Sequence, residues 1–205
     1  MQIWPDGSRY EGFWIENEQG GPGRLINANG DVYEGSWLRA MAHGKGTYTY
    51  SDGSSYQGDW HADKQHGQGR EQWPDGSVFE GTYVQGMKHG HGHFKWTDGS
   101  QYEGEFEQNQ IQGQGKYEWA DQRKYIGSWL DNKMEGHGEF TWPDGRKYTG
   151  EYLQDSKHGF GIFVWPNGKR YEGQWVKGIK HGKGKIIQPN GSEKEGTWHN
   201  GQLII

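Results

Sequence analysis

The sequence predicts an all-β protein: an elongated, single-layer antiparallel sheet of consecutive β-hairpins, twisted or trough-shaped. Three observations predict it: a period of 23 residues from Tyr10 to Tyr33 and onward, alternating aromatic residues and glycines, and a recurrent turn sequence. Such a fixed period is typical of repeat architectures, in which each repeat buries its surface against its neighbours. The first aromatic position falls at Tyr10, Tyr33, Tyr56, Phe79, Tyr102, Tyr125, Tyr148 and Tyr171, and a ninth copy begins at Lys194.

Each repeat contains two predicted strands. We number positions from Tyr10 and its equivalents, which take position 1, so that glycine occupies position 3 and an aromatic residue position 5 in all nine copies. Because successive side chains of a strand point to opposite faces, positions 1, 3 and 5 share one face. The second strand runs through glycines at positions 12 and 14 and then positions 16 and 18, as in residues 138–142.

A short turn joins each repeat to the next. Its sequence favours a type I turn followed by a left-handed glycine, the common three-residue hairpin loop. Within a repeat, we expect a longer loop at positions 6 to 11 to return the chain, and no segment shows the apolar period of a helix. Pro-Asp-Gly or a close variant occurs at residues 5–7, 51–53, 74–76, 143–145 and 166–168.

The turns set the register of the sheet. Position 16 should lie opposite position 1 of the next repeat, and position 14 opposite position 3. Of the 31 Trp, Tyr and Phe residues, 29 occupy positions 1, 5, 16 or 18, and the exceptions are Phe13 and Phe160. One face is therefore aromatic, and we expect each position 5 ring to cover the glycine opposite it at position 12.

The other face should be charged and solvated. In the predicted register, position 2 faces position 15, which brings acidic side chains opposite basic or polar ones. Exposed pairs of this kind contribute little stability individually, but their agreement with the register supports it. The pairs are Glu11 with Arg24, Glu34 with Thr47, Glu80 with His93, Glu103 with Lys116, and Glu172 with Lys185.

Composition narrows the protein class. With 30% hydrophobic residues and a mean hydropathy of -1.18, only the twelve Trp, twelve Tyr and seven Phe supply enough apolar area for order. The lack of cysteine excludes disulfides and thiol chemistry. Met1–Asp6 is no signal peptide and no apolar run is long enough to span a membrane, so we expect a cytoplasmic protein. The net charge of -5 gives no general attraction to nucleic acid.

Residues 33–37, Tyr-Glu-Gly-Ser-Trp, followed by His-Gly-Lys-Gly at 43–46, resemble the MORN (membrane occupation and recognition nexus) repeat. The resemblance covers residues 1–205 as one continuous array, with eight complete repeats over 10–193 and partial repeats at 1–9 and 194–205. It implies a chain of β-hairpins found in junctional, ciliary and cytoskeletal scaffolds, and also attached to lipid kinases and lysine methyltransferases. In such proteins the repeats serve binding or oligomerisation rather than catalysis.

The residues give little support to catalysis or metal binding. Histidines recur at position 11, but equivalent residues in consecutive repeats are two strands, ~9.6 Å, apart, which is too far to share a zinc ion. A hydrogen bond within the loop explains them better. Carboxylates recur at positions 2 and 20, whereas active sites are usually unique, so we expect no enzyme, metal or cofactor. The position 11 histidines are His43, His66, His89, His158 and His181.

The aromatic face is the candidate binding site. Its rings form the core of the sheet, but a single layer leaves part of them open to a helix or an extended segment of a partner protein. We predict partner binding by Trp37, Tyr56, Trp60, Tyr83, Trp96, Tyr102, Tyr117, Trp119, Tyr125, Trp129, Trp142 and Trp165.

Two local departures from the repeat pattern, and the open edges at the ends of the sheet, suggest alternatives to binding on the aromatic face. Gln122 replaces the turn glycine, which implies a different turn or local strain. Open sheet edges invite a homo-oligomer or an end-to-end contact. Residues 157–185 form a basic segment, which fits solvated loops, an acidic protein or anionic lipid. Its cations are Lys157, Lys169, Arg170, Lys177, Lys180, Lys183 and Lys185.

We therefore hypothesise a non-enzymatic scaffold whose aromatic face binds a partner segment in a cytoskeletal, ciliary or membrane-junction assembly. The assembly type comes from the family resemblance. The alternatives are peripheral membrane association through the basic C-terminal repeats, and a regulatory repeat domain of a larger enzyme such as a lipid kinase.

Overall fold

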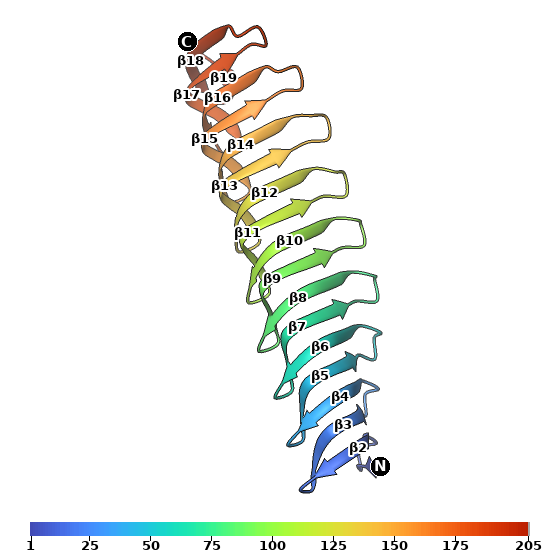
Figure 1. Ribbon diagram of the computed structural model, residues 1–205. Helices are drawn as coiled ribbons and strands as arrows, with labels where there is room; N and C mark the ends of the chain where they lie inside the picture. Colours follow the sequence, from blue (N-terminus) through green and yellow to red (C-terminus); the bar gives the residue numbers. More distant parts are fainter. Residues whose placement is uncertain (205) are drawn as a thin grey trace. The chain divides into compact units, whose positions relative to one another are not determined.

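The computed structural model describes residues 1–204, which form nineteen β-strands and no helix. They divide into two compact units: residues 1–98 with 106–109, and residues 99–105 with 110–204. Within each unit, consecutive strands pair antiparallel in chain order, so each hairpin lies beside the next (Figure 1). The prediction of an all-β, single-layer fold of consecutive hairpins is confirmed.

The strands alternate between seven and nine residues, apart from a two-residue strand at either end. The first unit contains β1 (Gln2–Ile3), β2 (Arg9–Ile15), β3 (Glu18–Ile26), β4 (Val32–Leu38), β5 (Met41–Thr49), β6 (Ser55–His61), β7 (Lys64–Gln72), β8 (Val78–Val84) and β9 (Met87–Lys95). Strand β10 (Gln101–Glu107) contributes residues to both units. The second unit continues with β11 (Gln110–Glu118), β12 (Lys124–Leu130), β13 (Lys133–Thr141), β14 (Lys147–Leu153), β15 (Ser156–Val164), β16 (Arg170–Val176), β17 (Ile179–Ile187), β18 (Glu193–His199) and β19 (Gln202–Leu203).

The three-residue turns between repeats form as predicted. In the turn at 51–53, the Gly53 N–H donates to Tyr50 O at 3.0 Å, and Gly53 has a φ of 91°. Gln122 keeps the same turn: its N–H donates to Trp119 O at 2.9 Å, with a φ of 69°. Of the two expectations for Gln122, the structure therefore selects backbone strain rather than a different turn.

The predicted longer loop at positions 6 to 11 is wrong. Strands β4 and β5 continue through Leu38 and Met41, which pair directly, and only Arg39 and Ala40 form the turn, both with positive φ. Two-residue turns of this kind match the twist of the flanking strands. Arg39 and Ala40 lack the usual Asn-Gly signal, and the neighbouring strand β3 supports the turn: the Ala40 N–H donates to Gln19 O at 3.0 Å.

The predicted register is confirmed, with one addition. Tyr48 pairs with Tyr33 of its own repeat and with Tyr56 of the next. Inside the hairpin of β4 and β5, however, the register shifts after position 3, between Gly35 and Trp37. This β-bulge leaves position 4 out of the ladder, and the hydroxyl of Tyr33 donates to the Ser36 carbonyl there at 2.9 Å. Seven position 1 tyrosines make this bond: Tyr10, Tyr33, Tyr56, Tyr102, Tyr125, Tyr148 and Tyr171.

The position 1 ring covers glycine, whereas the predicted cover by position 5 is wrong. A methyl group added to Gly46, at position 14, would collide with the Tyr33 ring, and one added to Gly35, at position 3, would collide with the backbone of β5 and the Tyr33 hydroxyl. Gly44, at position 12, does lie opposite Trp60, but its φ of 79° directs an added methyl group towards Ser36 on the charged face. The left-handed backbone at position 12 is the physical reason for the difference.

The buried rings contact one another edge to face. Tyr33 lies 5.0 Å from Trp37 of its own repeat and 5.2 Å from Trp60 of the next, with interplanar angles of 89° and 80°. The same arrangement recurs in the second unit, where Tyr148 lies 5.3 Å from both Tyr152 and Trp175. Edge-to-face pairs stabilise beyond their buried area, so each repeat is held to the next by rings.

We predict that Gly46→Ala lowers the free energy of unfolding by about 3 kcal/mol, because the new methyl group displaces the Tyr33 ring. Gly53→Ala is the control: Pro74 is 3.9 Å from its added methyl group, and only the positive φ opposes it, at a cost of about 1 kcal/mol. Urea unfolding followed by tryptophan fluorescence measures both. Equal losses would show that the ring does not constrain Gly46.

Candidate functional site

The aromatic face has a buried part and a half-buried part. Of the twelve predicted binding residues, seven lie at positions 1 or 5 and are at most 7% exposed: Trp37, Tyr56, Trp60, Tyr83, Tyr102, Tyr125 and Trp129. The position 5 indoles also bond to the backbone, as Trp37 Nε1 does to Gly23 O at 3.1 Å. These seven rings are core residues. The other five are half-buried and reach the surface: Trp96, Tyr117, Trp119, Trp142 and Trp165.

Four of the five half-buried rings belong to one continuous row in the second unit, here called the outer stack. It consists of Tyr117, Trp119, Phe140, Trp142, Phe163 and Trp165, from positions 16 and 18. Successive ring centroids are 4.5, 5.2, 4.4, 5.7 and 4.7 Å apart. In the first unit, Trp73, Phe94 and Trp96 form a shorter stack, with spacings of 5.2 and 4.4 Å.

Cations from the three-residue turns lie over the indoles of the outer stack. Arg123 is 5.4 Å from the Trp119 ring, and Arg146 is 5.3 Å from the Trp142 ring. Both guanidiniums also pair with an aspartate of the same turn, at 2.7 Å. In the third copy Lys169 lies 5.4 Å from Trp165. All three cations occupy position 22, where the first unit has Ser8, Asp31, Ser54 and Ser77.

Lysines at position 10 reach over the same face. Lys157 Nζ lies 5.1 Å from the Trp142 ring and 5.4 Å from the Trp175 ring, and Lys180 Nζ lies 4.6 Å from the Trp165 ring. Burial lowers the pKa of Lys157, and nearby Arg146 lowers it further. These lysines were not predicted to lie on the aromatic face, although lysine recurs at position 10, in Lys88, Lys157 and Lys180.

In the first unit, the position 10 lysine has a partner. Glu71 takes the place of a ring at position 16, and its Oε2 lies 2.7 Å from Lys88 Nζ and 2.9 Å from the Tyr83 hydroxyl, which donates to it. The side chains of Lys88 and Glu71 are 14% and 16% exposed. Lys88 also lies 5.0 Å from the Trp73 ring. The charges of Lys88 and Glu71 therefore neutralise each other within the aromatic face.

The structure does not bring the seven predicted cations onto one surface. Lys157, Lys169 and Lys180 lie on the aromatic face, and Lys177 lies in a two-residue turn with a φ of 49°. Arg170, Lys183 and Lys185 belong to alternate positions of β16 and β17, which point to the charged face.

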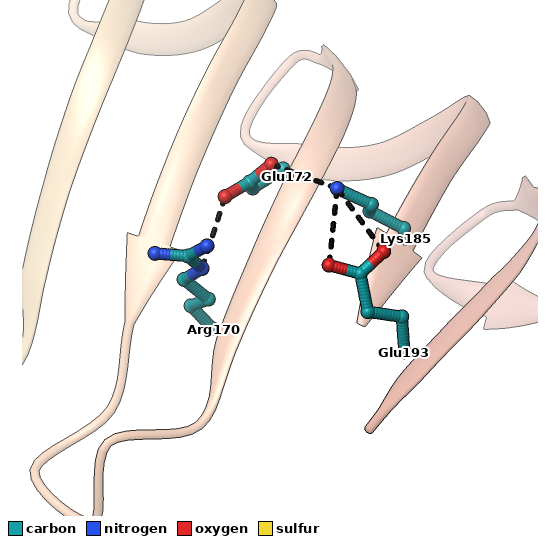
Figure 2. A network of polar contacts seen from close by, with 4 residues as sticks. All are labelled: Arg170, Glu172, Lys185 and Glu193. Carbon is teal, nitrogen blue, oxygen red and sulfur yellow. Dashed lines mark hydrogen bonds and ion pairs between the residues drawn. The ribbon is translucent and has the colours of Figure 1, made fainter. Parts of the chain in front are cut away.

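Ion pairs occupy the charged face. Glu172 lies opposite Lys185, as predicted, and its carboxylate is 3.7 Å from Lys185 Nζ and 3.0 Å from Arg170 Nε. Lys185 also reaches Glu193 at 3.3 Å, so four side chains form one network (Figure 2). The predicted opposition of Glu11 with Arg24, Glu34 with Thr47, and Glu80 with His93 is confirmed as well.

The position 11 histidines do not assemble a metal site. His43 and His66 lie 4.9 and 5.6 Å from the ring of His61, which comes from position 6. Across residues 1–204, no group of three His, Asp or Glu side chains is placed to hold a metal ion. At Gln112 and Glu135, the position 11 side chain supports the next turn: Gln112 Oε1 accepts the Asp131 N–H at 3.0 Å, and Glu135 Oε2 accepts the Gln154 N–H at 2.9 Å. In the described part of the chain, no helix is long and apolar enough to cross a membrane.

Comparison with known proteins identifies the repeat. The family model described as "MORN repeat" matches residues 10–32, 33–55, 56–78, 79–101, 102–122, 125–145, 148–170 and 171–193. No match to the chain is found among curated proteins.

Among solved structures, the chain is similar to the TCP domain of Drosophila melanogaster SAS-4 (dCPAP), solved in complex with a proline-rich motif of Ana2 (dSTIL). The identity is 12%, the match covers 86% of this chain and 90% of that one, and the TM-score is 0.49. The G-box domain of the microcephaly protein CPAP shows 16% identity, covers 97% of both chains and has a TM-score of 0.44. The TCP10 domain of Danio rerio CPAP, in complex with a STIL peptide, shows 15% identity over 99% and 90% of the chains, with a TM-score of 0.35. Scores below 0.5 transfer neither a partner nor a role to this chain.

We predict opposite effects for two Tyr→Phe substitutions at position 5. The buried Tyr152 hydroxyl has no hydrogen-bond partner, so Tyr152→Phe should stabilise the protein by up to about 1 kcal/mol. Tyr83→Phe removes the bond to Glu71 and should cost about 1 to 2 kcal/mol. Thermal and urea unfolding measure both changes. A loss of stability in Tyr152→Phe would contradict the assignment of an unpaired hydroxyl.

We also predict a loss of stability in alkali. Burial raises the pKa of Tyr33 and of Tyr171 to about 12. The unfolded chain releases these protons near pH 10, whereas the folded protein retains them, so the free energy of unfolding falls as pH rises from about 10 towards 12. Urea unfolding across this interval tests the sign. Tyr33→Phe should make the fall shallower, because it removes one such proton, and an equally steep fall would count against the raised pKa.

Proposed function

This chain belongs to the MORN repeat family, and from that premise we propose that it is a non-enzymatic scaffold whose outer stack binds a segment of a partner protein. The observation that carries the proposal is the row from Tyr117 to Trp165, which keeps four rings half-buried, three of them with cations over them. Tryptophan, tyrosine and arginine are the residues that dominate the binding energy of protein interfaces.

The site proposed here is narrower than the whole aromatic face. The rings of the second unit at positions 1 and 5 are enclosed by their neighbours, so a partner first reaches the half-buried rings Tyr117, Trp119, Trp142 and Trp165. These outer rings are already packed on the core and lose little side-chain entropy when a partner binds them. Such preorganisation favours affinity.

A protein partner fits the arrangement better than a flat membrane surface. Of the seven predicted cations, three lie on the aromatic face and three on the opposite face, so one bilayer surface would not meet them together. For the setting, we propose the cytoskeletal, ciliary or membrane-junction assemblies in which MORN repeats serve as scaffolds.

The test is a pull-down from a lysate of the source cells, with bound proteins identified by mass spectrometry. We expect Trp119→Ala/Trp142→Ala to lose a partner that the unchanged protein retains, by at least about tenfold, because two anchors of the interface are removed. Trp142→Phe, which keeps a ring at the site, should retain most of the binding.

The matched control is Phe160→Ala. Phe160 is 49% exposed and lines a hollow of the charged face with Glu172 and Lys185, so its loss should leave partner capture unchanged. Circular dichroism melts confirm that each variant is folded. If folded Trp119→Ala/Trp142→Ala captures the same partners as the unchanged protein, the outer stack is not the binding site.

A further inference from the structure

Two cations lie beside the Trp142 ring, and only one of them is paired with a carboxylate. Its ring has Arg146 at 5.3 Å and Lys157 at 5.1 Å. Arg146 pairs with Asp144 at 2.7 Å, but no carboxylate in the described chain lies within 4.0 Å of Lys157 Nζ. Lys157 is instead enclosed by rings, with Tyr148 and Phe163 at 5.4 and 5.6 Å. The site therefore has one uncompensated cation.

At Trp165, one repeat further on, the unpaired positive charge is larger. Lys169 and Lys180 lie 5.4 and 4.6 Å from its ring, and neither has a carboxylate within 4.0 Å among residues 1–204. The turn residue that pairs with arginine in the preceding repeats is here the uncharged Asn167, whose Oδ1 accepts the Lys169 N–H at 3.1 Å. Burial lowers the pKa of Lys180, and Lys169 lowers it further.

Within the outer stack, the unpaired cations lie beside these two indoles alone. At Trp119, one repeat before Trp142, Arg123 is paired with Asp121, and the position 10 residue of the following repeat is the uncharged Met134. Beyond Trp165, Gln188 replaces the indole at position 18. Charge thus rises along the outer stack from a neutral end at Trp119 to Trp165.

The spacing of the two charged indoles restricts the ligand. Equivalent residues of consecutive repeats are two strands apart, ~9.6 Å at the usual strand separation. In a polyproline II segment, every third residue returns to the same side after ~9.3 Å. Every second residue of a β-strand returns after ~6.7 Å. Seven residues of an α-helix span ~10.5 Å. The polyproline II spacing is closest.

We propose that the two cationic indole sites at Trp142 and Trp165 bind an acidic segment of a partner protein in polyproline II conformation, with carboxylates at every third residue. The carboxylates meet Lys157 at the first site and Lys169 and Lys180 at the second, while intervening side chains contact the outer stack. This inference rests on the proposed function and specifies the chemistry of its partner.

Charge complementarity favours this occupant. A protein with a net charge of -5 holds three unpaired ammonium groups around two half-buried indoles, where an incoming anion is poorly screened by solvent. A membrane surface is less suitable, because two of these ammonium groups, those of Lys157 and Lys180, lie among several rings.

The test uses a fluorescent peptide with glutamate at every third position, separated by Ser-Ala, and measures binding by anisotropy. We expect Lys157→Gln/Lys180→Gln to weaken binding at least about tenfold. Lys177→Gln/Lys183→Gln, which removes the same charge away from the outer stack, should change it less than about twofold. Lys157→Arg/Lys180→Arg should retain binding, which separates loss of charge from loss of packing. Melting curves exclude unfolding.

Three comparisons decide the outcome. A peptide of equal composition with its glutamates clustered should bind more weakly, and equal binding would overturn the spacing argument. Equal losses in the two Lys→Gln variants, or no binding at all, would overturn the site. Binding to phosphatidylserine vesicles that depends on Lys157 and Lys180, without peptide binding, would assign the site to lipid. If the peptide fails while Trp119→Ala/Trp142→Ala still loses its cellular partner, only the partner's chemistry is wrong and the proposed function stands.

Discussion

The fold depends on one close contact, that of the position 1 ring with two glycines. The Tyr33 ring fills the space where side chains of Gly35 and Gly46 would stand, so the two strands of a hairpin can approach beneath it. Its hydroxyl then satisfies the carbonyl that the β-bulge releases at Ser36. A single side chain therefore fixes the register, the bulge and the position of the next ring. This explains how a chain with 37 glycines and few aliphatic residues forms an ordered sheet without a second layer.

The same arrangement divides the aromatic face into rings that form the core and rings that are available to a partner. Rings at positions 1 and 5 are used by the core, as Trp37 is through its neighbours and its bond to Gly23. Rings at position 18, such as Trp119 and Trp142, pack on that core and remain half-buried. They are held in place by cations from two parts of the repeat, the turn and position 10. Because those cations are internally paired at Lys88 but not at Lys157, the two units present different chemistry on a common scaffold.

Much of the fold could be predicted from the sequence, because period, alternation and turn chemistry are local properties. The pairing of Glu172 with Lys185 followed from counting positions. The turn at Arg39 and Ala40 could not be found in this way, since support from a neighbouring repeat, rather than a turn signal, stabilises its positive φ. The exposure of each aromatic ring was still harder to predict from the sequence. Trp37 and Trp142 both belong to the predicted aromatic face, and only packing shows that one is a core residue and the other reaches the surface.

The nearest-neighbour contacts of Tyr33 also limit how the gene can change length. Its ring bonds within its own hairpin and packs on the indole of the following one. Excising one whole period inside a unit would rejoin equivalent partners, whereas removing a few residues would set rings against the wrong backbone. The array can therefore gain or lose only whole repeats. Related proteins should differ in the number of repeats rather than by short insertions or deletions within a repeat.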